Sequence, residues 1–340
     1  MGVVRRMFPL LAKKSIFRFK IDTRFTNPGA TDGSQLDNQF ILPTYSGNMI
    51  VKVNDGRPDI ILNGDYVNLR PQRTLTFAVA GEYEITVIGR SSIRFSNISP
   101  DQRKIIWVYE CGDGFRFLSN AFAGAINMIW DAPHARMNIL DRVFIGIKGF
   151  GSNADLSKYT VDLATDGIYV VSNTINPITS LFQGFFLNLT SAAQMYRDCN
   201  LSPSISKIEM IAPNLTTASS FMVNTNFKGR LIIKSNVLTN ISQIMYNGAN
   251  PPPLGGVDIR NVTSSVNIVS GLMSKANVDS TLLEWANDYD WSAIPNIPNK
   301  TTINFNFNTG ACTCSNTPAV VNALNFLKSK GYLFPYLTAI

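Results

Sequence analysis

The 340-residue sequence contains a single histidine, four cysteines and only five glutamates. A nucleophile–histidine catalytic set or a transition-metal site would have to use His134 alone. The four cysteines are too few and too scattered for a disulfide framework, and Cys312-Thr-Cys314 has no second pair to complete a zinc site. Two ordinary thiols are the simpler interpretation of that motif. The sequence therefore predicts no catalytic residue, no metal site and no cofactor.

Long apolar runs are also missing. No stretch approaches the roughly 18 apolar residues that a membrane-spanning helix needs. The apolar stretch Met7 to Ala12 is too short for the central region of a signal peptide, and two lysines follow it at once. These features predict a protein that is made in the cytoplasm and carried out of it by something else. With 45% hydrophobic and 16% charged residues, the chain is expected to fold.

Positive charge is concentrated at the start of the chain. The formal net charge is +7, and residues 1–24 hold seven basic side chains against one acid, Asp22. This distribution predicts a basic arm on a nearly neutral body. The arm would bind nucleic acid, an acidic membrane or an acidic protein, or it is a solvated tail. We take Arg5, Arg6, Lys13 and Lys14 as its candidate partner-binding residues, with a protein partner favoured over nucleic acid or membrane.

Residues 16–92 are typical of short antiparallel strands. Ser15 to Phe25 alternates apolar and polar residues, and so does Gly81 to Ile88. Further apolar runs lie between them at spacings near ten residues, separated by turn residues such as Asn54-Asp55-Gly56. About six such strands predict an antiparallel β-sandwich after an arm of residues 1–15.

Residues 93–278 contain a repeat. Leu189, Leu215 and Leu238 each begin a similar segment that runs from Leu-Thr to a Met-containing apolar pair and a polar turn. A weaker copy begins at Val262, and earlier decayed copies are expected near Leu118–Phe122, Leu140–Phe144 and Ile178–Phe182. Short β-like runs accompany the units at Ile208–Ile211, Leu231–Lys234 and Val257–Ile259. One strand per 23 to 26 residues predicts an irregular leucine-rich-repeat solenoid.

Residues 279–340 break that pattern and predict a helical C-terminal cap. A short helix is expected over Asp279–Asn287 and an amphipathic helix over Pro318–Lys330. Thr317 is the expected N-cap of the second helix, and Gly331 follows its end. The predicted fold class is thus mainly β with short helices: a sandwich, a solenoid and a cap.

Two sets of motifs resemble known families. Leu189-Thr190, Met195-Tyr196 and Cys199 resemble the leucine-rich repeats of BspA-like surface proteins, with Phe221-Met222 and Met245-Tyr246 at the same place in later units. The ending is similar to that family's as well, in Leu282-Leu283-Glu284-Trp285 and in Ala323 to Tyr332. Val53 to Gly56 and Gly81 to Ile85 resemble a PKD-type immunoglobulin-like module. The combination is similar to phage structural proteins of the tail or head-fibre kind.

Three other constellations have simpler interpretations. Asp288 and Asp290, beside Trp285 and Trp291, are too close in one loop for the two carboxylates of a glycosidase, although calcium is conceivable there. Gly146 to Gly151 lacks the Gly-Lys-Ser/Thr ending of a phosphate loop. The aromatic and Met residues of the repeats are expected in the core.

The sequence therefore predicts a non-enzymatic structural or adhesive protein of a phage virion. Its expected partners are other virion proteins or a host surface receptor, within a multi-subunit assembly and without a small-molecule substrate. The alternatives are a bacterial cell-surface leucine-rich-repeat adhesin, which would need export, and a carbohydrate hydrolase, which would need carboxylates that converge from different repeats.

Overall fold

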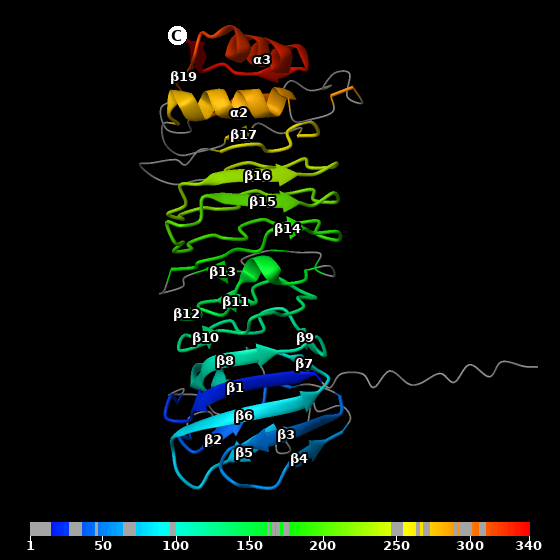
Figure 1. Cartoon of the computed structure of the whole chain (residues 1–340), viewed down its shortest axis with the longest axis vertical. Helices are drawn as coiled ribbons and strands as arrows, with labels where there is room; N and C mark the ends of the chain where they lie inside the picture. Colours follow the sequence, from blue (N-terminus) through cyan, green and yellow to red (C-terminus); the bar gives the residue numbers. More distant parts are fainter. Residues whose placement is uncertain are drawn as a thin grey trace, which may run out of the picture.

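The structure is a computed structural model of the whole chain. It describes residues 15–26, 36–44, 47–63, 73–95, 100–161, 164, 167, 171–172, 177–245, 254–262, 266–267, 273–287, 291–292, 301–305 and 311–340. Figure 1 shows an elongated molecule in which chain layers are stacked along the long axis. Antiparallel strands form one end, and two helices lie at the other end beside the C-terminus.

A seven-stranded sheet forms the first end of this column, in the order β12-β10-β8-β1-β6-β3-β4. Its strands are β1 (Ile16–Asp22), β3 (Met49–Val53), β4 (Ile60–Leu62), β6 (Glu82–Gly89), β8 (Ile105–Cys111), β10 (Ile129–Trp130) and β12 (Gly149–Phe150). The pairs from β4 to β8 are antiparallel, whereas β10 pairs in parallel with both β8 and β12. The sheet therefore changes from antiparallel to parallel at β8.

One face of this sheet is covered by a second layer of short strands. Phe17, Phe19 and Ile21 of β1 are fully buried, as the period-two alternation of the sequence requires. The covering strands are β2 (Gln39–Ile41) with β5 (Thr74–Thr76), which are antiparallel, and β7 (Ser91–Ile93) with β9 (Phe115–Phe117), which are parallel. The ring of Phe19 lies 5.9 Å from that of Phe40, and the ring of Phe17 lies 5.6 Å from that of Phe115.

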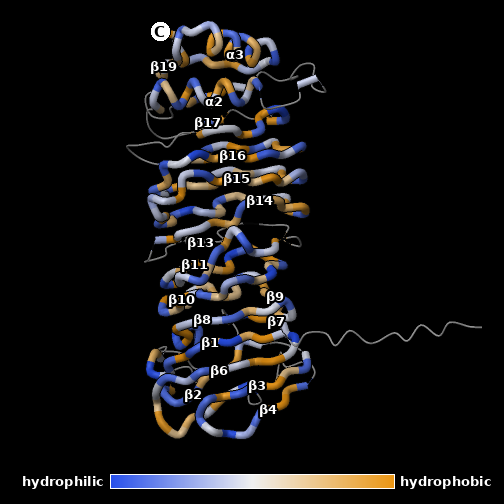
Figure 2. Tube along the Cα trace, viewed as in Figure 1, coloured by the Kyte–Doolittle hydropathy of each residue, from blue (hydrophilic) through white to orange (hydrophobic). Residues whose placement is uncertain are grey.

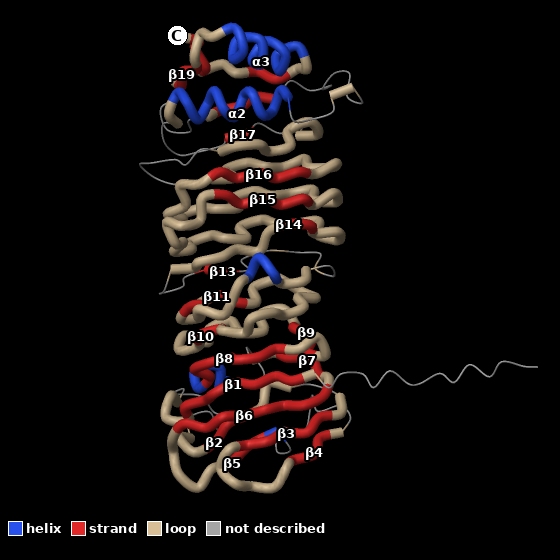
Figure 3. Tube along the Cα trace, in the orientation of Figure 1, coloured by secondary structure: helices blue, strands red, loops and turns tan. Residues whose placement is uncertain are grey.

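Beyond β9 the described strands are short (Figure 3), and all the pairs that they form are parallel. Besides β10 and β12 they are β11 (Phe144–Ile145) with β13 (Val171–Ser172); β14 (Gly184–Phe185), β15 (Lys207–Ile211) and β16 (Arg230–Lys234); β17 (Val266–Asn267), β18 (Thr301–Asn304) and β20 (Tyr332–Leu333); and β19 (Cys312–Cys314) with β21 (Leu337–Ala339). Figure 2 shows that hydrophobic and hydrophilic residues alternate along the whole column, so each layer contributes to one shared core.

A repeated turn builds successive layers. Two residues four positions apart have positive φ in each of four layers, namely Asn120 and Gly124, Arg142 and Gly146, Gln194 and Asp198, and Ser220 and Asn224. Backbone hydrogen bonds join three of these turns, at 120–124, 194–198 and 220–224, to the next layer. The N–H of Phe122 donates to the carbonyl of Val143 at 3.0 Å, and the N–H of Met222 donates to that of Ile244 at 3.0 Å. The left-handed residues direct the chain back so that each layer lies against the next.

Four helical segments complete the described structure. They are the 3-10 turns η1 (Pro100–Lys104) and η2 (Leu156–Lys158) and the α-helices α2 (Lys275–Asn287) and α3 (Pro318–Ser329). Helix α2 begins four residues earlier than predicted. Helix α3 has Thr317 at the N-cap without a side-chain cap bond, and Gly331 follows its end with a positive φ. The two helices pack together over the last layers (Figure 1).

The predicted architecture is wrong, although the chain is mainly β and the described part has two α-helices. Among the described residues the antiparallel strands do not form a separate sandwich, because the seven-stranded sheet continues past the predicted boundary between residues 92 and 93 into parallel strands. The described parallel strands that lie outside the seven-stranded sheet form separate sheets of two or three strands, not the continuous sheet of a leucine-rich-repeat solenoid. The C-terminal segment is also not simply a helical cap, since β18 to β21 pair in parallel within it. Strands of two residues offer too few backbone bonds to extend a sheet across every layer.

Candidate functional site

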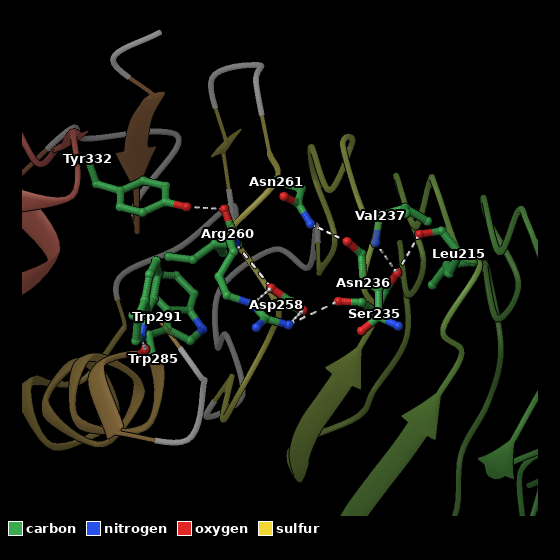
Figure 4. Close-up of polar contacts among 11 residues, drawn as sticks. Leu215, Ser235, Asn236, Val237, Asp258, Arg260, Asn261, Trp285, Trp291 and Tyr332 are labelled. Atoms are coloured by element: carbon green, nitrogen blue, oxygen red, sulfur yellow. Dashed lines mark hydrogen bonds and ion pairs between the residues drawn. The ribbon is translucent and has the colours of Figure 1, made fainter. Parts of the chain in front are cut away.

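Two sets of residues proposed from the sequence lie outside the described residues. They are the basic residues Arg5, Arg6, Lys13 and Lys14 and the acidic residues Asp288 and Asp290. Their part in a site stays a prediction. Trp285 and Trp291, in contrast, are described and buried, and the indole N–H of Trp291 donates to the Trp285 carbonyl at 3.0 Å (Figure 4). Neither indole is therefore open to stack on a sugar.

His134 lies on the surface, in a turn after β10. It lines a groove of about 720 Å³ together with Ser15, Arg90, Arg116 and Arg136. Within the described ranges His134 makes no hydrogen bond and no ion pair, so no neighbouring group fixes its ring tautomer. A histidine that acts as a general base in a nucleophile–histidine set is oriented by such a bond. The geometry is that of an ordinary exposed histidine.

The four cysteines are free and buried. Burial raises the pKa of the Cys111 and Cys199 thiols well above the usual range. The thiolate is the reactive form of cysteine, so these thiols are poor nucleophiles and poor metal ligands. Cys312 and Cys314 lie on β19, and burial raises their pKa values as well. Across the described part of the chain, no three His, Cys, Asp or Glu side chains come together as a metal site.

A network of buried polar groups joins three layers to the C-terminal segment (Figure 4). The Arg260 guanidinium donates to both carboxylate oxygens of Asp258, at 3.0 and 2.7 Å, and Asp258 is 1% exposed. The Ser235 hydroxyl donates to the Leu215 carbonyl at 2.7 Å, and the Tyr332 hydroxyl donates to the Ile259 carbonyl. Because these donors and acceptors satisfy one another, the network holds layers together and offers no open site.

A shallow groove of about 800 Å³ runs along the middle layers. Asp155 of the η2 region and Gln183, Lys207 and Glu209 of the β14–β15 region are among its lining residues. A hydrogen bond from Ser157 lowers the pKa of Asp155, and a hydrogen bond from Lys207 lowers that of Glu209. Both carboxylates are therefore ionised and already engaged, whereas a carboxyl that serves as a general acid needs a raised pKa. The groove is better suited to binding than to proton transfer.

Large apolar side chains are exposed beside this groove. We call Phe185, Leu187, Ile211 and Val237 the apolar ridge; they are 61%, 48%, 38% and 42% exposed. Phe185 and Ile211 are partners in the parallel register of β14 and β15. The Asn214 amide, from the next layer, donates to the Leu187 carbonyl at 2.8 Å. Phe185 and Ile211 thus form an exposed apolar pair on neighbouring layers, and exposed apolar side chains that lie together mark contact surfaces.

The apolar ridge was not predicted from the sequence. The aromatic and Met residues of the repeats were expected in the core, and this is confirmed for Met195, Tyr196, Phe221 and Met222, all of which are 0% exposed. The available signal was Phe185-Phe186-Leu187. Three consecutive apolar residues in an extended segment cannot all point inward, and Phe186 alone does so here.

Comparisons of this chain with protein families, with curated proteins and with solved structures give no match. In the ranges that the structure describes, no helix has both the length and the apolar character to cross a membrane.

Proposed function

We propose that this chain is a non-enzymatic structural or adhesive protein that works by binding other macromolecules through its surface. The observation that supports this proposal is the apolar ridge on neighbouring layers, next to a groove lined by charged and polar side chains. Stacked layers give an extended surface without any need for an enclosed cavity. A partner protein would cover the ridge and bond to the groove's Lys207 and Glu209 at its edge.

The proposed setting is a phage particle, with other virion proteins or a host surface receptor as partners. This step rests on the sequence resemblance to BspA-like and PKD-type modules in phage structural proteins, not on the fold. An adhesin of a bacterial surface would use the same ridge. The location of the protein in infected cultures distinguishes the two.

Mass spectrometry of purified phage particles from a culture that produces the protein tests the setting. We expect the chain in a fixed ratio to the capsid and tail proteins after repeated density-gradient purification. Recovery only in the bacterial envelope fraction would favour the adhesin and would contradict the phage proposal.

The ridge itself is tested by the double variant Phe185→Asp, Ile211→Asp. Both side chains are exposed, so the thermal midpoint is expected to stay within a few degrees of the parent. Incorporation into particles, or binding to cells, should fall at least tenfold because charges replace the apolar contact. The matched control is Val79→Asp, at a residue that is 69% exposed just before β6, in the antiparallel end of the column and away from the ridge. Equal binding by both variants would show that the ridge is not the contact surface.

A further inference from the structure

Four isoleucines form a row across the antiparallel end of the molecule. Ile16 of β1 is the register partner of Ile88 of β6, and Ile88 is also the partner of Ile50 on β3. Ile50 in turn pairs with Ile61 of β4, the edge strand. Figure 1 shows these four strands side by side at the lower end of the column. We call these four residues the isoleucine row.

The row lies on the outward face of the sheet. The neighbouring residues Phe17 and Val51 point to the opposite face and are fully buried, whereas Ile61 is 68% exposed. Ile50, Ile61 and Ile88 line a mainly apolar hollow of about 310 Å³. The next row on the same face is polar, with Arg18, Thr86 and Lys52 in register. Ile16, Ile50 and Ile88 are half-buried and Ile61 is exposed. Single exposed isoleucines are common on protein surfaces, but four partly or fully exposed ones in one register form an apolar stripe that an apolar partner can cover.

The chain itself supplies an apolar segment close to this stripe. Ser15 is the first described residue, and it directly precedes Ile16, where the row begins. The sequence just before it is Met7-Phe8-Pro9-Leu10-Leu11-Ala12, followed by Lys13 and Lys14. Three interstrand steps of about 4.8 Å make the row about 14 Å long. Six extended residues reach about 20 Å, so Met7–Ala12 is long enough to cover the row, with Lys13 to Ser15 left to reverse the chain.

We propose that Met7–Ala12 of the same chain docks across the isoleucine row. A tether of three residues gives the segment a local concentration in the millimolar range. A second copy of the protein at micromolar concentration would have to bind roughly a thousandfold more tightly to compete for the same stripe. Docking would bury the apolar part of the arm and hold Arg5 and Arg6 beside the edge strand β4. This inference concerns the isolated chain and does not depend on the proposed function.

Cross-linking between engineered cysteines tests the proposal in the full chain. The double variant Leu10→Cys, Ile61→Cys is treated with a short bismaleimide, and the four natural cysteines stay protected because they are buried. We expect a link within one chain that forms at least ten times faster than in the control Leu10→Cys, Phe185→Cys. Phe185 is similarly exposed, at 61%, but lies on β14 in the middle layers. Equal rates, or links only between two chains, would overturn the proposal, and the second result would indicate that another copy covers the row.

Hydrogen exchange gives a second readout. The variant Leu10→Asp, Leu11→Asp should speed amide exchange in β3 and β4 at least tenfold, because the row loses its cover. The control Lys13→Ala, Lys14→Ala removes charge but keeps the apolar segment, and it should exchange like the parent. Unchanged exchange in the Asp variant would contradict docking, whatever the outcome of the particle experiments.

Discussion

Asp258 and Arg260 form their ion pair inside the column instead of on its surface. Asp258 is 1% exposed, and the guanidinium also approaches the Ser235 carbonyl at 3.5 Å. A charge at this depth is tolerated only while its partner remains, because desolvation of a lone buried ion is costly. The pair therefore makes the contact between β16 and the following layer sensitive to a single substitution.

Replacement of one partner measures this sensitivity. Arg260→Ala is expected to lower the free energy of unfolding by about 3–5 kcal/mol, since it removes the guanidinium that pairs with the buried carboxylate of Asp258. Asp59→Ala is the control, because its 3.0 Å pair with Lys52 lies on the surface and should contribute about 0–1 kcal/mol. Urea unfolding followed by tryptophan fluorescence gives both values. Similar losses in the two variants would show that Asp258 is solvated in solution.

Asp22 gives the protein a defined response to acid. It is 4% exposed, and hydrogen bonds from Arg24 lower the pKa of its carboxyl. A lowered folded-state pKa means that the ionised form stabilises the fold above the unfolded value near 3.8, and that this stabilisation is lost as the pH falls through the folded pKa. We expect urea midpoints to be lower at pH 3 than at pH 6. Asp22→Asn should cost about 1 kcal/mol at pH 6 and less at pH 3; the same cost at both pH values would contradict this role.

At the scale of elements, the repeated turn is the unit that makes layers. Its second left-handed position is occupied by Gly124, Gly146, Asp198 and Asn224, which are the residue types that adopt positive φ most readily. The first position is less selective and includes Arg142 and Gln194. The second position is thus where the backbone conformation most restricts the sequence.

Gly146, with φ of 67°, tests this restriction. A Cβ there would meet only the Gly124 backbone nitrogen at 3.9 Å, so steric contact is not the obstacle. Gly146→Val should lower stability by about 1–2 kcal/mol through the left-handed conformation alone. Gly146→Asn adds a side chain that tolerates this conformation, and it should cost less than half as much. Thermal unfolding by circular dichroism distinguishes the two, and equal losses would mean that φ is not the cause.

Individual elements were predicted well where a period or a cap identifies them. The alternation after Ser15 gives β1, the runs at Ile208 and Leu231 fall within β15 and β16, and Pro318 begins α3. The pairing of these elements could not be predicted. β10 has two residues and therefore no periodicity, yet its parallel contact with β8 carries the sheet into the layers. The ridge was equally hidden, because the exposure of Phe185 depends on which layers lie beside it and not on its own segment.

At the scale of the whole molecule, the two helices protect the end of the column. The Arg230 guanidinium of β16 pairs with Glu284 of α2, and α2 packs against α3. The rings of Trp291 and Phe326 meet edge to face at 5.7 Å between centroids. These contacts cover the apolar edge that the last layers would otherwise expose.

Leu327→Asp should open this end. Leu327 is 0% exposed on α3, so a buried carboxylate there is expected to detach the helix from α2 and to cost more than about 3 kcal/mol. The exposed layer edge should then promote self-association, visible as larger species in sedimentation velocity at room temperature. Asn325→Asp, on the exposed side of the same helix, should remain monodisperse. A monodisperse Leu327→Asp protein would show that the helices are not needed as a cover.

Because strand pairing changes from antiparallel to parallel at β8, the two ends of the column differ in structure, and the column has a direction. Parallel stacking adds each layer in the same sense, so an array of copies held by one end would present every groove and ridge at the same height and in the same orientation. One further layer would raise the far end by only about 5 Å and would leave both ends chemically unchanged. The length of such a column can therefore change without any change in the end by which it is attached.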